Sequence, residues 1–265
     1  MSKKAPKSGA YDLIIEDIFF NHYQGDQGEF EFVRREIIAA QERLAPGLDL
    51  NPGDVPYSFR YRRPLPQRIL DTQPKGQEWI IEGAGRAVYR FRLVRSTRIE
   101  PNPNLIVTAI PDATPELIRG YALDDEQALL AIVRYNRLID TFLSLTTYSL
   151  QNHLRTTVKG IGQIEIDELY IGLDKRGCHY VIPVQAKGGK DQIGIVQTTQ
   201  DIRFVDEKFP GIQCRAVSAQ FMSDQVVALF ELTLKDDEIR VVDERHYRLV
   251  PANTLDPAAI RDYRG

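Results

Sequence analysis

Three polar side chains in the second half of the chain have the types and spacing needed for phosphodiester chemistry. They are Asp167, then Gln185 eighteen residues later, and then Lys187. Carboxylate and amide oxygens are ligands that a hard divalent cation prefers. A lysine ammonium group beside them can orient or deprotonate a water molecule, or neutralise charge that develops on a reacting phosphate. Together these residue types predict metal-assisted hydrolysis of a phosphodiester bond.

A β-hairpin must bring these side chains together, because they lie on two different segments. Residues Asp174–Gly177 read DKRG, a turn sequence, and a strand pattern lies on each side of it. Folding back at the centre of this turn places Asp167 opposite Val184 or Gln185. Side chains alternate along a strand, so Gln185 and Lys187 share one face. In one of these two registers, the Asp167 carboxylate, the Gln185 amide and the Lys187 ammonium group meet at one end of a sheet.

The motif Ile166–Asp167 followed by Gln185–Lys187 resembles that of the PD-(D/E)XK nuclease superfamily, which includes restriction endonucleases and repair nucleases. The predicted order of helix, hairpin, helix and strand, over roughly residues 125–235, agrees with that resemblance. By resemblance, Asp167 matches the metal-binding aspartate and Lys187 the catalytic lysine. Gln185 stands where the common pattern has Asp or Glu, although some restriction enzymes carry glutamine there.

The resemblance also implies a cofactor and a set of roles. It implies Mg²⁺, with Mn²⁺ as a substitute, held by the Asp167 carboxylate, the Gln185 amide oxygen and the backbone carbonyl of Ala186. Lys187 would orient the attacking water. Glu165 lies on the same predicted face as Asp167 and would supply the charge that Gln185 lacks. Gln197 and Gln200, in the next predicted helix, resemble polar residues that such nucleases place beside the site.

Charge is distributed unevenly along the chain. The net charge is −3, yet residues 57–98 contain nine arginines and one lysine against three acidic residues. This segment therefore carries +7, and the remaining residues carry −10. Such asymmetry is typical of a localised phosphate-binding surface. We expect seven of its arginines to contact nucleic acid: Arg60, Arg62, Arg63, Arg68, Arg86, Arg90 and Arg92.

The pattern of the first 105 residues favours a winged helix-turn-helix. A helical pattern begins at Tyr11, a second helix is predicted over 29–45, and a short helix over 65–74. A hairpin follows, whose second strand, 86–94, alternates apolar residues with arginines. In a winged helix-turn-helix the third helix enters the major groove and the wing lies along phosphates. The alternative is an ordinary α+β domain with a solvated arginine face.

The rest of the chain predicts an α/β fold with a mixed β-sheet flanked by helices, as in a restriction-endonuclease-like core. Residues 96–115 contain four prolines and are the predicted linker between a winged-helix-like domain (1–105) and a nuclease domain (106–265). Residues 124–143 predict one long helix, which 146–158 either extend or follow as a second helix. A helix over 191–210 predicts that the next strand runs parallel to 180–187.

The sequence gives no support for a metal site built on cysteines, a membrane span, a signal sequence or a hydrolase triad. The two cysteines have no metal-ligand spacing and are expected to be buried free thiols, which points to a cytoplasmic protein. No apolar run approaches the length of a membrane span. The first ten residues lack a signal sequence and are predicted to be a disordered tail. His153, read as a helix residue, has no serine or cysteine partner at a recognisable spacing.

The sequence predicts a Mg²⁺-dependent DNA endonuclease of restriction or defence type. Its expected ligand is double-stranded DNA, its expected assembly a homodimer, and a cognate methyltransferase a possible partner. Two other hypotheses remain open. One is a DNA-binding regulator on a catalytically inactive nuclease fold, which the neutral Gln185 would suit. The other is a toxin-like interaction module whose basic face binds RNA or an acidic protein.

Overall fold

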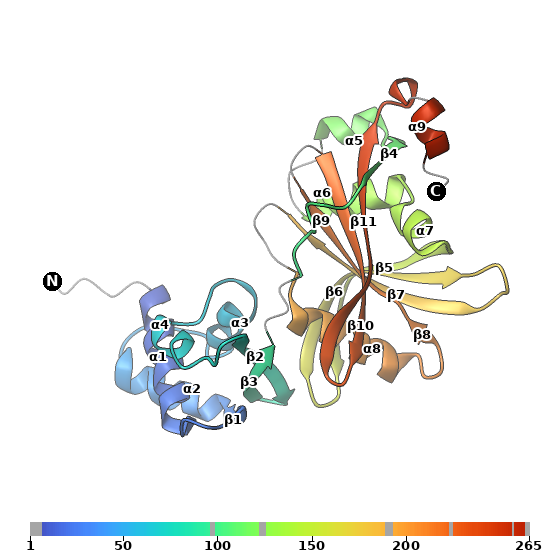
Figure 1. Ribbon diagram of the computed structural model, residues 1–265. Coiled ribbons are helices and arrows are strands. Elements are labelled where there is room, and N and C mark those ends of the chain that lie inside the picture. Colours follow the sequence, from blue (N-terminus) through green and yellow to red (C-terminus); the bar gives the residue numbers. More distant parts are fainter. Residues whose placement is uncertain are drawn as a thin grey trace. The chain divides into compact units, whose positions relative to one another are not determined.

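The computed structural model describes residues 7–95, 99–121, 126–188, 193–222, 225–255 and 257–262. The chain divides into two compact units (Figure 1). Unit 1 comprises Met1–Thr97 and Thr157–Gln163, and unit 2 comprises Arg98–Thr156 and Ile164–Gly265. The protein is a mixed α/β protein with a small antiparallel sheet in unit 1 and a large mixed sheet in unit 2.

Unit 1 packs helices against a three-stranded sheet with the strand order β1-β3-β2. Its elements are α1 (Lys7–His22), β1 (Glu29–Val33), α2 (Arg34–Leu44), α3 (Asp54–Tyr61), α4 (Gln67–Leu70), β2 (Gln77–Gly85) and β3 (Val88–Arg95). Aromatic side chains form much of the buried core, because Phe19 of α1 lies edge-on to Trp79 and Phe91 of the sheet. Alternation along β3 buries Phe91 and turns Arg90 and Arg92 to the other face, as predicted.

The structure corrects four predictions in unit 1. Residues 29–33 are a strand and not the start of a helix, because alternate phenylalanines pair with β3, as in Phe30 with Phe91. The helix starts only at Arg34, where the Glu36 carboxylate accepts a hydrogen bond from the Val33 amide. Helix α3 was not predicted, and α4 is only four residues long. Residues 7–10 belong to α1, and the rest of the predicted tail lies outside the described residues.

Unit 2 is built on an eight-stranded sheet with the order β4-β11-β10-β9-β7-β6-β5, in which β8 also pairs with β7. Its strands are β4 (Val107–Pro111), β5 (Thr146–Val158), β6 (Gly162–Leu173), β7 (His179–Lys187), β8 (Gln213–Cys214), β9 (Ala216–Phe221), β10 (Val226–Lys235) and β11 (Glu238–Val250). Its helices are α5 (Glu116–Tyr121), α6 (Glu126–Tyr135), α7 (Leu138–Leu143), α8 (Ile195–Lys208) and α9 (Pro257–Asp262).

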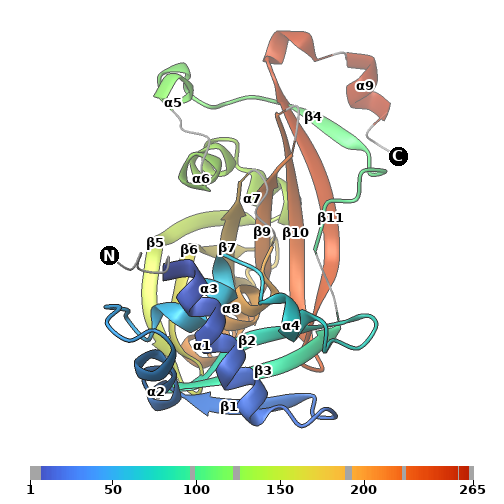
Figure 2. The ribbon, with the colours of Figure 1, turned by 90° about the vertical axis from the view of Figure 1, so that its left-hand side faces the viewer.

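Helices cover both faces of this sheet. Leu129 of α6 and Leu138 of α7 share a buried cluster with Val184 and Val217. The neighbouring residue Ala216 points the other way and joins Ile202 of α8 in a second cluster. Alternation along the central strands therefore gives one face to α6 and α7 and the opposite face to α8. Figure 2 shows β9, β10 and β11 of this sheet running side by side.

Two of the predicted connections in unit 2 are confirmed. Strands β6 and β7 form the antiparallel hairpin around Asp174–Gly177, with Glu168 paired to Val184. Strand β9 runs parallel to β7 after the crossover helix α8, with Gln185 paired to Ser218. The described part of α8 begins at Ile195.

Three other predictions in unit 2 were wrong. The predicted linker contains β4, which pairs in parallel with β11; residues 96–98 lie outside the described part of the chain. The predicted long helix is broken into α6 and α7 at Arg137, whose φ of 48° is left-handed. Residues 146–158 form strand β5, the edge of the sheet, and not a helix. None of the helices in the described residues is both long and apolar enough to cross a bilayer.

Candidate active site

The β6–β7 hairpin brings together the three side chains that the sequence singled out. The pairing of Glu168 with Val184 places Asp167 beside the Gln185–Ala186 segment of β7. One Asp167 oxygen, Oδ2, accepts a hydrogen bond of 3.0 Å from the backbone amide of Ala186. Gln185 and Lys187 flank that amide and share one strand face. The end of β7 thus positions an amide and an ammonium group around the carboxylate.

A fourth side chain, Asp201, completes the cluster from helix α8. The Gln185 amide nitrogen donates a hydrogen bond to Asp201 Oδ2, and both side chains are almost fully buried, at 1% and 2% exposed. The remaining oxygen of each, Gln185 Oε1 and Asp201 Oδ1, is also buried. Neither oxygen has a hydrogen-bond partner among the described residues. An unsatisfied buried acceptor is costly, and a pair of them beside the Asp167 carboxylate calls for a functional explanation.

The electrostatics of this cluster favour the arrival of positive charge. Burial raises the pKa of Asp201 well above its ordinary value, and the neighbouring Asp167 raises it further. Burial also raises the pKa of Asp167, while the Ala186 amide and Lys187 lower it. Lys187 lowers the pKa of both carboxyl groups and makes no ion pair within 4 Å among the described side chains. One ammonium group therefore faces two carboxylates.

The donor set fits a hard divalent cation. Asp167, Asp201 and the Gln185 amide offer oxygen atoms, and two of these are buried acceptors without a partner in the described chain. The described residues contain no cluster of three or more His, Cys, Asp or Glu side chains placed to hold a metal ion. The candidate centre therefore depends on the amide oxygen of Gln185 as its third side-chain ligand.

Glu165, which the sequence suggested as an additional acid, lies at the margin of this cluster. Its carboxylate forms an ion pair with Arg155 at 3.3 Å and approaches His153 Nδ1 at 3.8 Å. His153 is an exposed residue of β5 with a left-handed φ of 48°, and not a helix residue as predicted. Its charged form lowers the pKa of Asp167. Glu165 thus has cationic partners of its own, and Asp201 supplies the second carboxylate of the cluster.

Glu168 faces the opposite side of the sheet, as strand alternation predicts. It is fully buried, forms an ion pair of 2.9 Å with Arg134 of α6, and accepts a hydrogen bond of 2.7 Å from Ser149 of β5. Burial and the Glu168 carboxylate raise the pKa of the neighbouring Tyr170. The Glu168–Arg134 pair joins α6 to the sheet on the face opposite to the Asp167 side chain.

Sequence reasoning did not identify Asp201, although the pattern of α8 contains a signal. Val196, Ile202 and Val205 are buried apolar residues of α8, and the charged Asp201 falls among them on the same buried side. A carboxylate on the apolar stripe of a helix needs a partner. Gln197 and Gln200, which the sequence did suggest, flank this position, and Gln200 is buried.

The arginines of unit 1 divide into two groups. Four of the seven form ion pairs with acidic residues of unit 1: Arg63 with Asp12, Arg68 with Glu16, Arg90 with Glu29, Glu31 and Glu82, and Arg92 with Glu82. The arginine face of β3 is therefore largely neutralised by glutamates. The other three, Arg60, Arg62 and Arg86, form no ion pair with a described residue.

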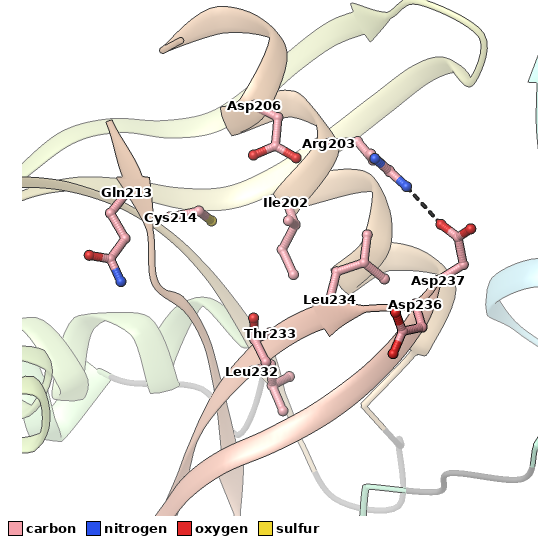
Figure 3. Close-up of a pocket in the computed structure, with 10 residues that line it drawn as sticks. All are labelled: Ile202, Arg203, Asp206, Gln213, Cys214, Leu232, Thr233, Leu234, Asp236 and Asp237. Atoms are coloured by element: carbon pink, nitrogen blue, oxygen red, sulfur yellow. Dashed lines mark hydrogen bonds and ion pairs between the residues drawn. The ribbon is translucent and has the colours of Figure 1, made fainter. Parts of the chain in front are cut away.

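A polar cavity of about 500 Å³ lies on α8 but shares no residue with the Asp167 cluster. Figure 3 shows Arg203 and Asp206 of α8 and Thr233 of β10 around it, with Arg203 paired to Asp237 at 2.7 Å. Burial raises the pKa of Cys214 in its wall, so that thiol keeps its proton. Helix α8 thus contributes to two separate polar regions.

No protein-family model, curated protein or solved structure matches the chain.

Proposed function

We propose that the protein is a Mg²⁺-dependent DNA endonuclease of the PD-(D/E)XK type, with a restriction-endonuclease-like core in unit 2. One observation supports this most strongly. Asp167, Gln185 and Asp201 converge beside Lys187, and two of their buried oxygens have no partner among the described residues. The motif spacing, the β6–β7 hairpin and the crossover helix α8 agree with the same proposal.

Each residue of the cluster has a role in hydrolysis. Asp167, Gln185 and Asp201 would hold Mg²⁺, with the Ala186 backbone carbonyl as a further candidate ligand. The bound cation lowers the pKa of water and neutralises phosphate charge. Lys187 orients the attacking water and balances the charge that develops on the nonbridging phosphate oxygens. A bond forms between the water oxygen and phosphorus as the bond to the 3′-oxygen breaks; the water gives up one proton to solvent, and the 3′-oxygen takes one proton from solvent. The products carry 5′-phosphate and 3′-hydroxyl ends.

Unit 1 is the proposed DNA-binding part. Its order of α1, α2, α3, α4 and a β2–β3 hairpin is compatible with a winged-helix-like module. Arg60, Arg62 and Arg86 are better candidates for phosphate contacts than Arg90 and Arg92, because glutamates neutralise the latter two. Cutting both strands requires two sites, so we propose a homodimer acting in a restriction or defence system.

Cleavage of DNA by the purified full chain tests the proposal. Supercoiled, methylated and branched substrates are incubated with Mg²⁺ or Mn²⁺, and the ends of the products are identified. We expect nicked or linear products, and a loss of at least about 100-fold in rate for Lys187→Ala, the scale of removing one transition-state contact. The matched control is Lys208→Ala, at the far end of α8, where the lysine pairs with its neighbour Glu207. Intact substrates under all conditions, or full activity of Lys187→Ala, would overturn the proposal.

A second function, DNA binding without cleavage, has one specific observation in its favour. Gln185 is neutral and its amide nitrogen is already bonded to Asp201. If the chain binds DNA but never cuts it, while Gln185→Glu binds Mg²⁺ and cuts, the natural protein is a regulator built on an inactive nuclease fold.

A further inference from the structure

Helix α3 carries two neighbouring tyrosines on an exposed surface of unit 1. Tyr57 and Tyr61 are one helical turn apart, and their ring centroids are 5.0 Å apart. Their side chains are 42% and 37% exposed, although the same helix buries Val55 and Phe59. Large aromatic side chains exposed as a pair are unusual on a surface that has a well-packed core beneath it.

Two arginines lie over these rings. The Arg62 guanidinium is 4.9 Å from the centre of the Tyr57 ring, and the Arg60 guanidinium is 5.0 Å from the centre of the Tyr61 ring. Such cation–π contacts hold a guanidinium plane in place without consuming its hydrogen-bond donors. Two Arg60 nitrogens, Nε and Nη2, are in fact buried without a hydrogen-bond partner among the described residues.

Charge separates these two arginines from the next ones along the chain. Arg63 also lies over an aromatic ring, that of Phe59, but it is paired with Asp12. Arg68 lies over Phe20 and is paired with Glu16. Arg60 and Arg62 form no ion pair with any residue that the structure describes. The tyrosine pair is therefore bordered by positive charge that no described acidic residue neutralises.

Flat aromatic and guanidinium faces with adjacent positive charge match the chemistry of an unpaired nucleotide. A base stacks on such faces, and its phosphate pairs with the donors of the exposed Arg62 guanidinium. Bases inside a duplex are already stacked on each other and offer only their edges to a protein. We propose that Tyr57, Arg60, Tyr61 and Arg62 form a binding site for unpaired nucleotides at a single-stranded tail, gap or flipped position. The proposal deepens the nuclease function by naming the substrate class, but binding alone tests it.

Fluorescence anisotropy in the presence of EDTA measures this binding without cleavage. The full chain is titrated into four labelled probes at about 150 mM salt, because affinities without a stated salt concentration mean little. The probes are single-stranded DNA, single-stranded RNA, a blunt DNA duplex and the same duplex with a single-stranded tail. We expect the tailed duplex to bind more tightly than the blunt one. Comparison of the DNA and RNA strands identifies which source of unpaired nucleotides is preferred.

Substitutions at Tyr57 separate stacking from other contacts. Tyr57→Ala is expected to weaken binding to the tailed duplex by about 5- to 100-fold, the range measured for loss of one base–aromatic stack. Tyr57→Phe keeps the ring and should bind within about twofold of the natural chain. Arg62→Ala should weaken binding and reduce its salt dependence. Tyr121→Ala, which removes an 82% exposed tyrosine of unit 2, is the control that should change nothing.

Three results would overturn the proposal: unchanged binding of the tailed duplex by Tyr57→Ala, an equal loss for Tyr57→Phe, or an equal loss on the blunt duplex. Circular dichroism and thermal melting establish that each variant is folded, which is expected because Tyr57 is exposed. The anisotropy titration in EDTA reports binding under conditions in which no cleavage occurs. A chain that binds tailed DNA but cuts nothing therefore removes the nuclease proposal and leaves this one standing.

Discussion

Asp167 and Glu168 are adjacent on β6, yet the two faces of the sheet treat their carboxylates differently. Glu168 faces α6, where Arg134 supplies a counter-ion at 2.9 Å and Ser149 a hydrogen bond. Asp167 faces the side covered by α8, where a second buried carboxyl group, Asp201, lies close to it. One Glu168 oxygen also lacks a hydrogen-bond partner among the described residues, so the hydrogen-bond count alone does not separate the sites. The two sites differ because the Glu168 carboxylate has an arginine, Arg134, as its counter-ion.

This comparison separates a structural carboxylate from one that is kept for a ligand. A buried ion pair such as Glu168 with Arg134 is complete within the chain, and breaking it leaves an uncompensated charge. Two buried carboxyl groups that share one lysine are incomplete, because burial favours their neutral forms. A divalent cation would complete the second site and would find nothing to neutralise in the first. Substitutions on either face of β6 test this distinction.

The largest expected effect is on catalysis. Asp167→Asn should reduce the cleavage rate by at least about 1000-fold, because it removes a charged ligand and transition-state stabilisation together. Glu165→Gln removes a carboxylate two residues away that already pairs with Arg155. Its rate should fall by no more than about tenfold, on the scale of a surface ion pair. Equal losses in the two variants, measured by single-turnover cleavage, would place the site elsewhere on the strand.

The second largest expected effect is on stability. Here the substitution at Glu168 should cost more stability than the substitution at Asp201 on the opposite face of the sheet. Glu168→Gln leaves Arg134 without its counter-ion and should lower the free energy of unfolding by about 1–2 kcal/mol, a value reduced because Arg134 is 42% exposed. Asp201→Asn removes a buried charge and keeps an oxygen for the Gln185 amide. At pH 8 without divalent cations it should unfold at the same or a higher urea concentration than the natural chain. A clear loss of stability in Asp201→Asn would mean that its carboxylate is structural.

The substitution Gln185→Glu tests whether the Gln185 side chain is a metal ligand. A third carboxylate in the cluster should tighten Mg²⁺ binding by about tenfold, since charge strengthens a hard-cation site. The same change should destabilise the metal-free chain, because Asp201 would then face a like charge across a buried contact. Isothermal calorimetry and urea unfolding, each with and without Mg²⁺, measure the two effects. A variant that gains no affinity would exclude Gln185 as a ligand.

The smallest expected effect is a pH dependence with a definite sign. The pKa values of Asp201 and Asp167 are raised in the folded chain, so the unfolded chain loses these protons at lower pH. The stability contribution is complete below the ordinary aspartate pKa of about 3.9 and is lost as pH rises through the folded-state values. Asp201→Asn should flatten this decline. Stabilisation by Mg²⁺ should grow with pH, because the cation binds the ionised form. Urea unfolding between pH 4 and pH 8 tests both trends.

The sequence predicted the hairpin because its determinants are local. The DKRG turn and the alternation on both sides of it leave two registers, and the observed one places Asp167 beside Gln185 and Ala186. Strand β5 could not be predicted in the same way. Its side chains are mostly exposed, so it has no apolar alternation, and its pairing with β6 decides its conformation. Tertiary context overrides propensity at such an edge strand.

Asp201 was missed for a related reason. A helix sequence shows that a carboxylate is on the buried side, but the sheet decides which strand residue it meets. In unit 1, the sequence showed where arginines are concentrated, but it did not show which acidic residues pair with them. Two of the glutamates that neutralise Arg90, Glu29 and Glu31, come from β1, at a distant position in the sequence. Pairing across a sheet is not visible from the charge of one segment.

Mn²⁺ binding to the metal-free chain can be measured by electron paramagnetic resonance of the free ion. This measurement tests whether the Asp167 and Asp201 carboxyl groups are kept for a cation. We expect one ion per natural chain and the same affinity for Glu168→Gln. Asp167→Asn and Asp201→Asn should each bind at least about tenfold more weakly, the lower limit for changes at or next to a metal ligand. Natural affinity in both aspartate variants would contradict the claim that these two carboxyl groups, and not Glu168, are kept for a cation.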